Sequence, residues 1–129
     1  MDYGITVHTS GPFAQTVDRV RDALRSQGFG VLTEIDVRAT LREKLGEEME
    51  DYLILGACNP PLAHRALNAD RRIGMLLPCN VVVRTEDGGT VVEAADPQAM
   101  MALADDPGLA QVASEAAGRL RAALDSLAA

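Results

Sequence analysis

The sequence predicts one α+β domain over residues 1–129, with an antiparallel or mixed sheet and helices covering one face. Two observations predict this fold. Segments with strand periodicity alternate with segments of helical periodicity, in the order β-α-β-α-β-α-β-β-α-α. The segment Glu86-Asp87-Gly88-Gly89 predicts a tight hairpin, which joins antiparallel strands. No linker, repeat or low-complexity tract divides the chain.

The chain opens with a strand, a helix and a second strand. Residues 4–9 alternate between apolar and polar side chains, which predicts a half-buried strand. Ser10-Gly11-Pro12 then predicts a helix start, with Ser10 as the cap, and Gly28 ends the helix. Alternation returns over residues 29–36, so the second strand is also expected to have one exposed face.

The middle of the chain contains two predicted helices on either side of a third strand. Val37, Leu41 and Leu45 lie at helical spacing and predict a short amphipathic helix that ends at Gly46. Residues 52–57 form a compact apolar strand. A helix over residues 61–67 and a connection over residues 70–77 are expected to follow.

The last third contains the hairpin and two helices. Its strands are predicted over residues 79–85 and 90–95. Asp96-Pro97 and Pro107 each start a helix, because proline is tolerated in a first helical turn. The last helix has a continuous apolar face, which packs on the sheet or serves as a dimer face.

The charge and the cysteine count restrict the class of protein. A formal net charge of −7 and an isoelectric point near 4.7 oppose binding to nucleic acid and to anionic membranes. No apolar run approaches the ~20 residues that span a bilayer, and no export signal precedes the domain. We therefore expect a cytoplasmic protein. Its two cysteines, Cys58 and Cys79, are then expected to be reduced thiols.

The most informative stretch is LILGACNPPLAHRAL, from Leu53 to Leu67, in which an apolar strand stops at Cys58 and Asn59 before a helix begins. Asn59 is a natural helix cap. The unpaired amides and the positive end of the helix dipole stabilise a thiolate at an exposed Cys58. Two interpretations stay open: Cys58 is a small buried residue in a tight turn, or it belongs to a site.

Cys79 follows Pro78 at the start of its strand, whereas Cys58 follows the end of its own strand. In antiparallel neighbours, the end of one strand lies beside the start of the other. The two thiols would then share one edge of the sheet and line one pocket with Asn59. In a parallel crossover they would lie at opposite ends.

Several ordered motifs resemble the domain of unknown function 302 family. They are Leu55-Gly56-Ala57-Cys58-Asn59-Pro60, Gly74-Met75-Leu76-Leu77-Pro78-Cys79 and, after the hairpin, Asp96-Pro97. The resemblance covers about residues 36–97. It implies a small α+β fold with a curved antiparallel sheet, and homodimers. Many members have glycine where this chain has Cys58, so the resemblance does not make a thiol essential, and it brings no established activity.

Three kinds of chemistry could use this region. An anion could bind the amides of residues 58–62 together with Arg65, Arg71 or Arg72. A metal or heme could use Cys58 and Cys79 with His64, His8 or Met100, although no C-x-x-C motif is present. A thiol enzyme would pair Cys58 with His64, or with Cys79 in a redox couple.

The sequence therefore predicts a non-catalytic, homodimeric module with a small-molecule or anion pocket. The predicted ligand-binding residues are Cys58, Asn59, Pro60, Cys79 and Arg72. The alternatives are a thiol-dependent redox enzyme or metal carrier, and a purely structural interaction module. The cofactor, the metal and any catalytic residue stay unassigned.

Overall fold

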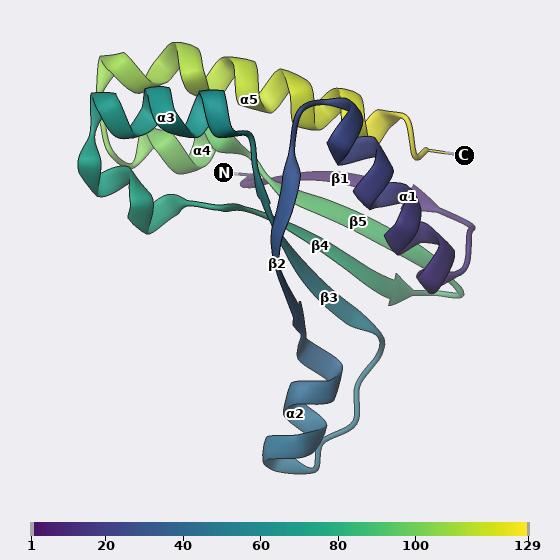
Figure 1. The fold of residues 1–129 in the computed structure, drawn as a ribbon. Coiled ribbons are helices and arrows are strands. Elements are labelled where there is room, and N and C mark those ends of the chain that lie inside the picture. The colour runs from purple at the N-terminus through teal and green to yellow at the C-terminus, as the bar shows by residue number, and fades with distance from the viewer. Residues whose placement is uncertain (1, 129) are drawn as a thin grey trace.

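The computed structural model describes residues 2–128, in which five strands form one antiparallel sheet (Figure 1). The strand order is β1-β5-β4-β3-β2, so β1 and β2 are the two edges. The strands are β1 (Gly4–Thr9), β2 (Gly30–Asp36), β3 (Tyr52–Cys58), β4 (Cys79–Glu86) and β5 (Gly89–Ala95). The α+β prediction is confirmed, and all four strand pairings are antiparallel.

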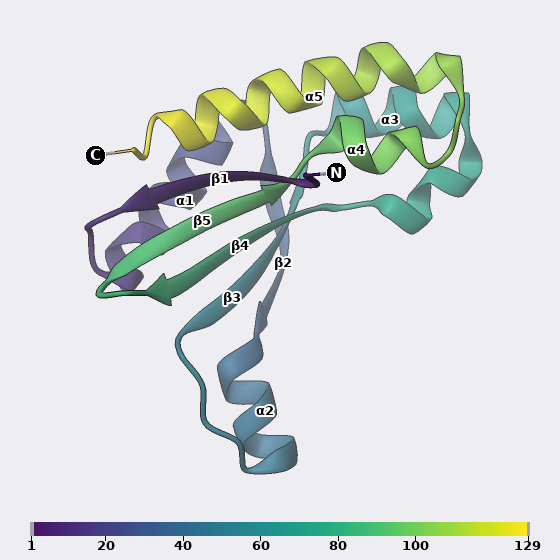
Figure 2. The same ribbon diagram turned by 180° about the vertical axis from the view of Figure 1, so that it is seen from behind.

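The helices are α1 (Phe13–Ser26), α2 (Val37–Leu45), α3 (Pro60–Ala69), the short 3₁₀ helix η1 (Arg71–Leu76), α4 (Pro97–Ala102) and α5 (Pro107–Asp125). Of these, α1 and α5 pack on one face of the sheet. The main core joins α1 and the C-terminal half of α5 to alternate residues of the strands, such as Leu55, Val81 and Val92. Figure 2 shows β3, β4 and β5 from the side that no helix covers. No helix within residues 2–128 is long and apolar enough to cross a bilayer.

The N-terminal half of α5 builds a second core beyond the end of the sheet. Leu109, Val112, Ala113 and Ala116 pack there against α3, η1 and Met101 of α4. Because α5 is 19 residues long, it crosses both cores and joins them. Its apolar face is buried within the chain, so the prediction that this face could mediate dimerisation is wrong.

Two local predictions need correction. Ser10 does not cap the first helix: Pro12 is the residue before α1, and no side chain caps it. The hydroxyl of Thr16 instead donates to the Pro12 carbonyl at 2.8 Å. Residues 70–77 are not a plain connection, because η1 forms there and the Asp70 side chain accepts a hydrogen bond from the Arg72 amide at 2.9 Å.

Strand β2 and helix α2 form an arm, which we define as residues 30–51. The expected half-buried strand is wrong: a bulge between Val31 and Thr33 adds Leu32 to β2, and most of the strand is exposed. Helix α2 has no buried residue, so the predicted apolar face of this helix is not covered by the rest of the chain. In both ribbon views α2 projects away from the other helices (Figures 1 and 2).

Candidate functional site

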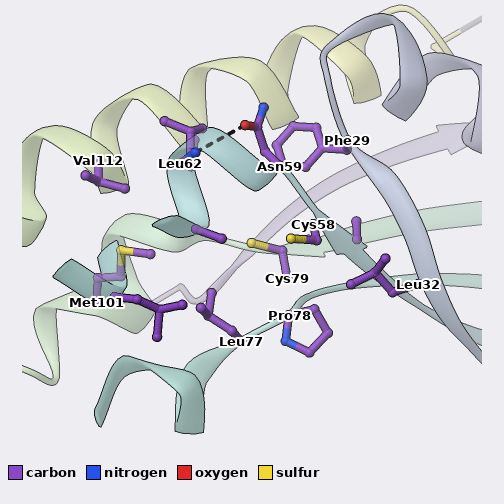
Figure 3. A pocket seen from close by; sticks show the side chains of 14 residues that line it. Phe29, Leu32, Cys58, Asn59, Leu62, Leu77, Pro78, Cys79, Met101 and Val112 are labelled. Atoms are coloured by element: carbon purple, nitrogen blue, oxygen red, sulfur yellow. Dashed lines mark hydrogen bonds between the residues drawn. The ribbon is translucent and has the colours of Figure 1, made fainter. Parts of the chain in front are cut away.

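A cavity of about 290 Å³ lies between the two cores, beneath the middle of α5 (Figure 3). Its walls come from every layer of the fold: Phe29, Leu32, Ala57, Cys58, Asn59, Leu62, Ala63, Leu67, Leu77, Pro78, Cys79, Met101, Val112 and Ala116. No charged side chain is among them. Leu32 is 68% exposed although it lines the cavity, so it marks the side that opens to solvent.

The sheet register brings the two cysteines to this cavity. Ala57 of β3 lies opposite Cys79 of β4, so Cys58 is one residue beyond that pair. The expected shared edge is confirmed, since both thiols line the cavity and their side chains lie next to one another in Figure 3. Both residues are intermediate in exposure, and both are free cysteines.

The two thiols are poorly suited to act as nucleophiles together. Burial, and to a lesser extent the nearby Cys58, raise the pKa of the Cys79 thiol from an ordinary 9.0 to about 11. A thiolate is disfavoured there because an apolar wall does not replace the solvation that the charge would lose. Cys79 is therefore a protonated, essentially apolar group at neutral pH.

Asn59 closes the start of α3 instead of leaving it open. The Leu62 amide donates to Asn59 Oδ1 at 3.3 Å, and the Ala63 amide donates to the Asn59 carbonyl at 2.9 Å. Pro60 and Pro61 carry no N–H at all. The first turn thus presents no free amide from residue 60 to residue 63, and the predicted anion would lack these donors.

Asn59 also connects two helices. Its Nδ2 donates to the carbonyl of Gln27, which follows the end of α1, at 3.4 Å. The side chain is 8% exposed, and both ends of its amide have partners inside the protein. Asn59 therefore fixes the shape of the cavity and has little capacity left to bind a charged ligand.

The remaining predicted residues lie away from the cavity. Pro60 is exposed and lines no wall of it. Arg72 is an exposed residue of η1, beside a separate depression with Asp70 and Met75. Arg65 forms an ion pair with Glu115 at 2.8 Å.

The structure places no further metal ligand or catalytic base beside the two cysteines within residues 2–128. His64 is exposed and 3.4 Å from Asn68 Nδ2, so it does not pair with Cys58. Among residues 2–128, no three His, Cys, Asp or Glu side chains come together as a metal site.

Sequence reasoning missed most of the cavity wall. The missed wall residues lie at apolar positions of predicted helices or at strand starts, where the sequence pattern predicts only ordinary core residues. They include Phe29, Leu62, Met101, Val112 and Ala116. The usable signal is the length of the last helix, because a helix longer than the sheet must extend past its end. That signal does not specify which residues meet.

Comparisons with known proteins agree with this architecture. The model of the family described as domain of unknown function DUF302 matches residues 5–127. The crystal structure of an uncharacterized conserved DUF302 protein from Bacillus stearothermophilus is similar, with 34% sequence identity and a TM-score of 0.93. The alignment covers 98% of this chain and 99% of that one. No curated protein matches the chain.

Proposed function

This chain belongs to the DUF302 family, and from its geometry we propose that it is a non-catalytic binding module for a small neutral, apolar molecule. The supporting observation is the cavity between the two cores. It has apolar walls contributed by both cores, and its one amide side chain is already satisfied internally. Pockets of this type are the usual sites for apolar ligands.

The character of the walls determines the ligand class. A charged ligand would lose its hydration without gaining an ion pair, because no Arg, Lys, Asp or Glu lines the cavity. An apolar ligand gives up no charge hydration and gains from the burial of its apolar surface. The thiols of Cys58 and Cys79 serve in this proposal as soft, polarisable wall groups.

A neutral fluorescent dye, phenylnaphthylamine, tests the proposal. The dye is expected to bind with enhanced emission, and Ala63→Phe, which adds a ring to the cavity wall, is expected to abolish the enhancement. Ala122→Phe is the matched control, because Ala122 is an exposed alanine of α5 that lines no wall of the cavity. Leu67→Trp is a second filling variant if Ala63→Phe does not fold. Equal enhancement in the filled and control variants would refute the cavity as the site.

Alanine replacement of the cysteines separates this function from the alternatives. Under the proposal, Cys58→Ala and Cys79→Ala keep dye binding, and the protein purified with reductant holds no stoichiometric metal. A redox enzyme or a metal carrier would require at least one of the two thiols. Loss of binding or of bound metal in either single variant would favour these alternatives.

We also propose that the protein is a cytoplasmic homodimer that forms without disulfides. The supporting observation is the arm. Ile35 and Leu45 are 49% and 68% exposed, and within residues 2–128 the strand β2 pairs only with β3. An unpaired, apolar strand edge commonly pairs with another chain unless it is protected. A nine-residue helix without a buried face also gains stability from a partner.

Light scattering measures this assembly. We expect a dimer for the wild type and a monomer for the double variant Ile35→Lys, Leu45→Glu. Leu103→Glu is the control, since Leu103 is 74% exposed but lies on the opposite part of the molecule, after α4. A wild-type monomer, or a double variant that stays dimeric, would contradict the arm as the interface.

A further inference from the structure

A second cavity adjoins the first and suggests the shape of the ligand. It has a volume of about 210 Å³ and is lined by Met75, Leu76, Leu77, Pro78, Cys79, Asn80, Ala95, Pro97, Met100 and Met101. Four residues line both cavities: Leu77, Pro78, Cys79 and Met101. The two spaces therefore share one wall, which consists of residues 77–79 and Met101.

Met101 is a flexible partition between these spaces. Its side chain is 7% exposed and belongs to the second core. Methionine has three rotatable bonds and fills irregular gaps, so it can change rotamer with little cost in packing. Figure 3 shows the Met101 side chain at the end of the first cavity, next to Leu77.

The two cavities differ in polarity. The first has only Asn59 and two thiols among apolar walls, and the Asn59 amide is already bonded. The second has the exposed Asn80 at its edge, and again no charged residue. A long aliphatic chain fits the first space, and a neutral polar group such as a hydroxyl fits beside Asn80.

We infer that the ligand is an elongated neutral amphiphile, with an aliphatic chain that runs from the first cavity past Met101 and Cys79 into the second. This inference rests on the proposed function and names its ligand class. A cavity of about 150 Å³ accommodates benzene, so the first cavity holds about twelve carbon atoms and the second about eight. A chain that fills only the first cavity leaves the second unused.

A series of linear alcohols from hexanol to hexadecanol, competing with phenylnaphthylamine, tests the inference. Each added methylene is expected to tighten binding about fourfold. In the wild type this gain continues beyond dodecanol. In Ala95→Phe, which fills only the second cavity, the gain is expected to stop near dodecanol while hexanol binds unchanged. Ala122→Phe, on the exposed face of α5, should behave as the wild type.

The outcomes separate the two proposals. If the wild type also levels off near dodecanol, or if Ala95→Phe has no effect on the longest alcohols, the elongated ligand is refuted and the simple cavity stands. If no alcohol displaces the dye, both proposals are refuted.

Hexadecanoate provides a check on the head group, because a carboxylate gains no ion pair in either cavity and should bind more weakly than hexadecanol. Equal or tighter binding of hexadecanoate would overturn the neutral head group.

Discussion

Asn59 links helix capping to the shape of the cavity. It accepts from the Leu62 amide, donates to the Gln27 carbonyl and lines the cavity wall. A buried amide with partners at both ends specifies the positions of both neighbouring helices. The residue that the sequence identifies as a cap therefore also sets the distance between the end of α1 and the start of α3.

Replacing Asn59 tests this double role. Asn59→Ala is expected to lower the free energy of unfolding by about 1–2 kcal/mol through the lost cap, and to weaken dye binding as well. Asp106→Ala is the control, because Asp106 caps α5 through the Gly108 amide at 2.8 Å but lines no wall of the first cavity. Urea unfolding and dye titration measure both. Dye affinity that is equally reduced in both variants would contradict a specific role of Asn59.

The raised pKa of Cys79 predicts that the stability of the protein depends on pH. Its pKa is about 11 in the folded protein against 9.0 for an ordinary thiol. Between these values the unfolded chain has lost the proton that the folded chain keeps, so stability falls as the pH rises. The protonated Cys79 thiol contributes fully to the free energy of unfolding below about pH 9, and this contribution is lost as the pH rises to about 11. Within this window the loss is about 1.4 kcal/mol per pH unit.

Unfolding of Cys79→Ala across the same pH window isolates this contribution from other groups that titrate there. The variant is expected to lose less stability than the wild type between about pH 9 and pH 11. Cys58→Ala should keep most of the dependence, because burial is the larger cause of the raised pKa. Identical slopes for Cys79→Ala and the wild type would show that this thiol is not buried as described.

At the scale of elements, β3 packs so closely against its neighbours that there is no room for a side chain at Gly56. A Cβ atom there would lie 2.1 Å from Thr33 Oγ1 and 2.9 Å from Pro78 Cγ. Thr33 belongs to the bulged strand β2, and Pro78 lines both cavities. The close contact between β2, β3 and the segment before β4 thus positions the wall of the site.

Two glycine-to-alanine variants are expected to have opposite effects. Gly56→Ala should cost about 1–3 kcal/mol of stability and weaken dye binding, because Thr33 and Pro78 must move. Gly118→Ala, in the interior of α5 with no atom near the added Cβ, should instead stabilise the protein by about 0.5–1 kcal/mol. Thermal unfolding of both proteins measures the difference. A Gly56→Ala variant as stable as the wild type would contradict the close approach.

Local patterns predicted many of the elements well. The hairpin is confirmed, with Asp87 and Gly88 both at positive φ between β4 and β5. The last helix has the predicted apolar face, and Asn59 is the cap of α3. Predictions failed where tertiary contacts decide. Strand β2 lies at the edge of the sheet and most of its residues are exposed, and α2 has an apolar stripe that nothing buries.

At the scale of the whole molecule, the site exists because one long helix joins two cores. The shared edge of Cys58 and Cys79 could be anticipated from their order along antiparallel strands, whereas the pairing of Ala57 with Cys79 comes from the structure. The contribution of Met101, Val112 and Ala116 could not, because these residues come from helices whose packing depends on the entire fold. The anion hypothesis lost most of its predicted donors for a local reason, since two prolines and a cap remove the free amides of residues 60–62.

The location of the bound molecule is the most direct test of the account. Methyl NMR spectra recorded during titration with phenylnaphthylamine report it residue by residue. The account predicts shifts for Leu62, Leu67 and Val112, which line the cavity, and unchanged signals for Ile54 and Val82 on the uncovered face of the sheet. Shifts confined to Ile54 and Val82, or no shifts at saturating dye, would contradict a binding cavity between the two cores.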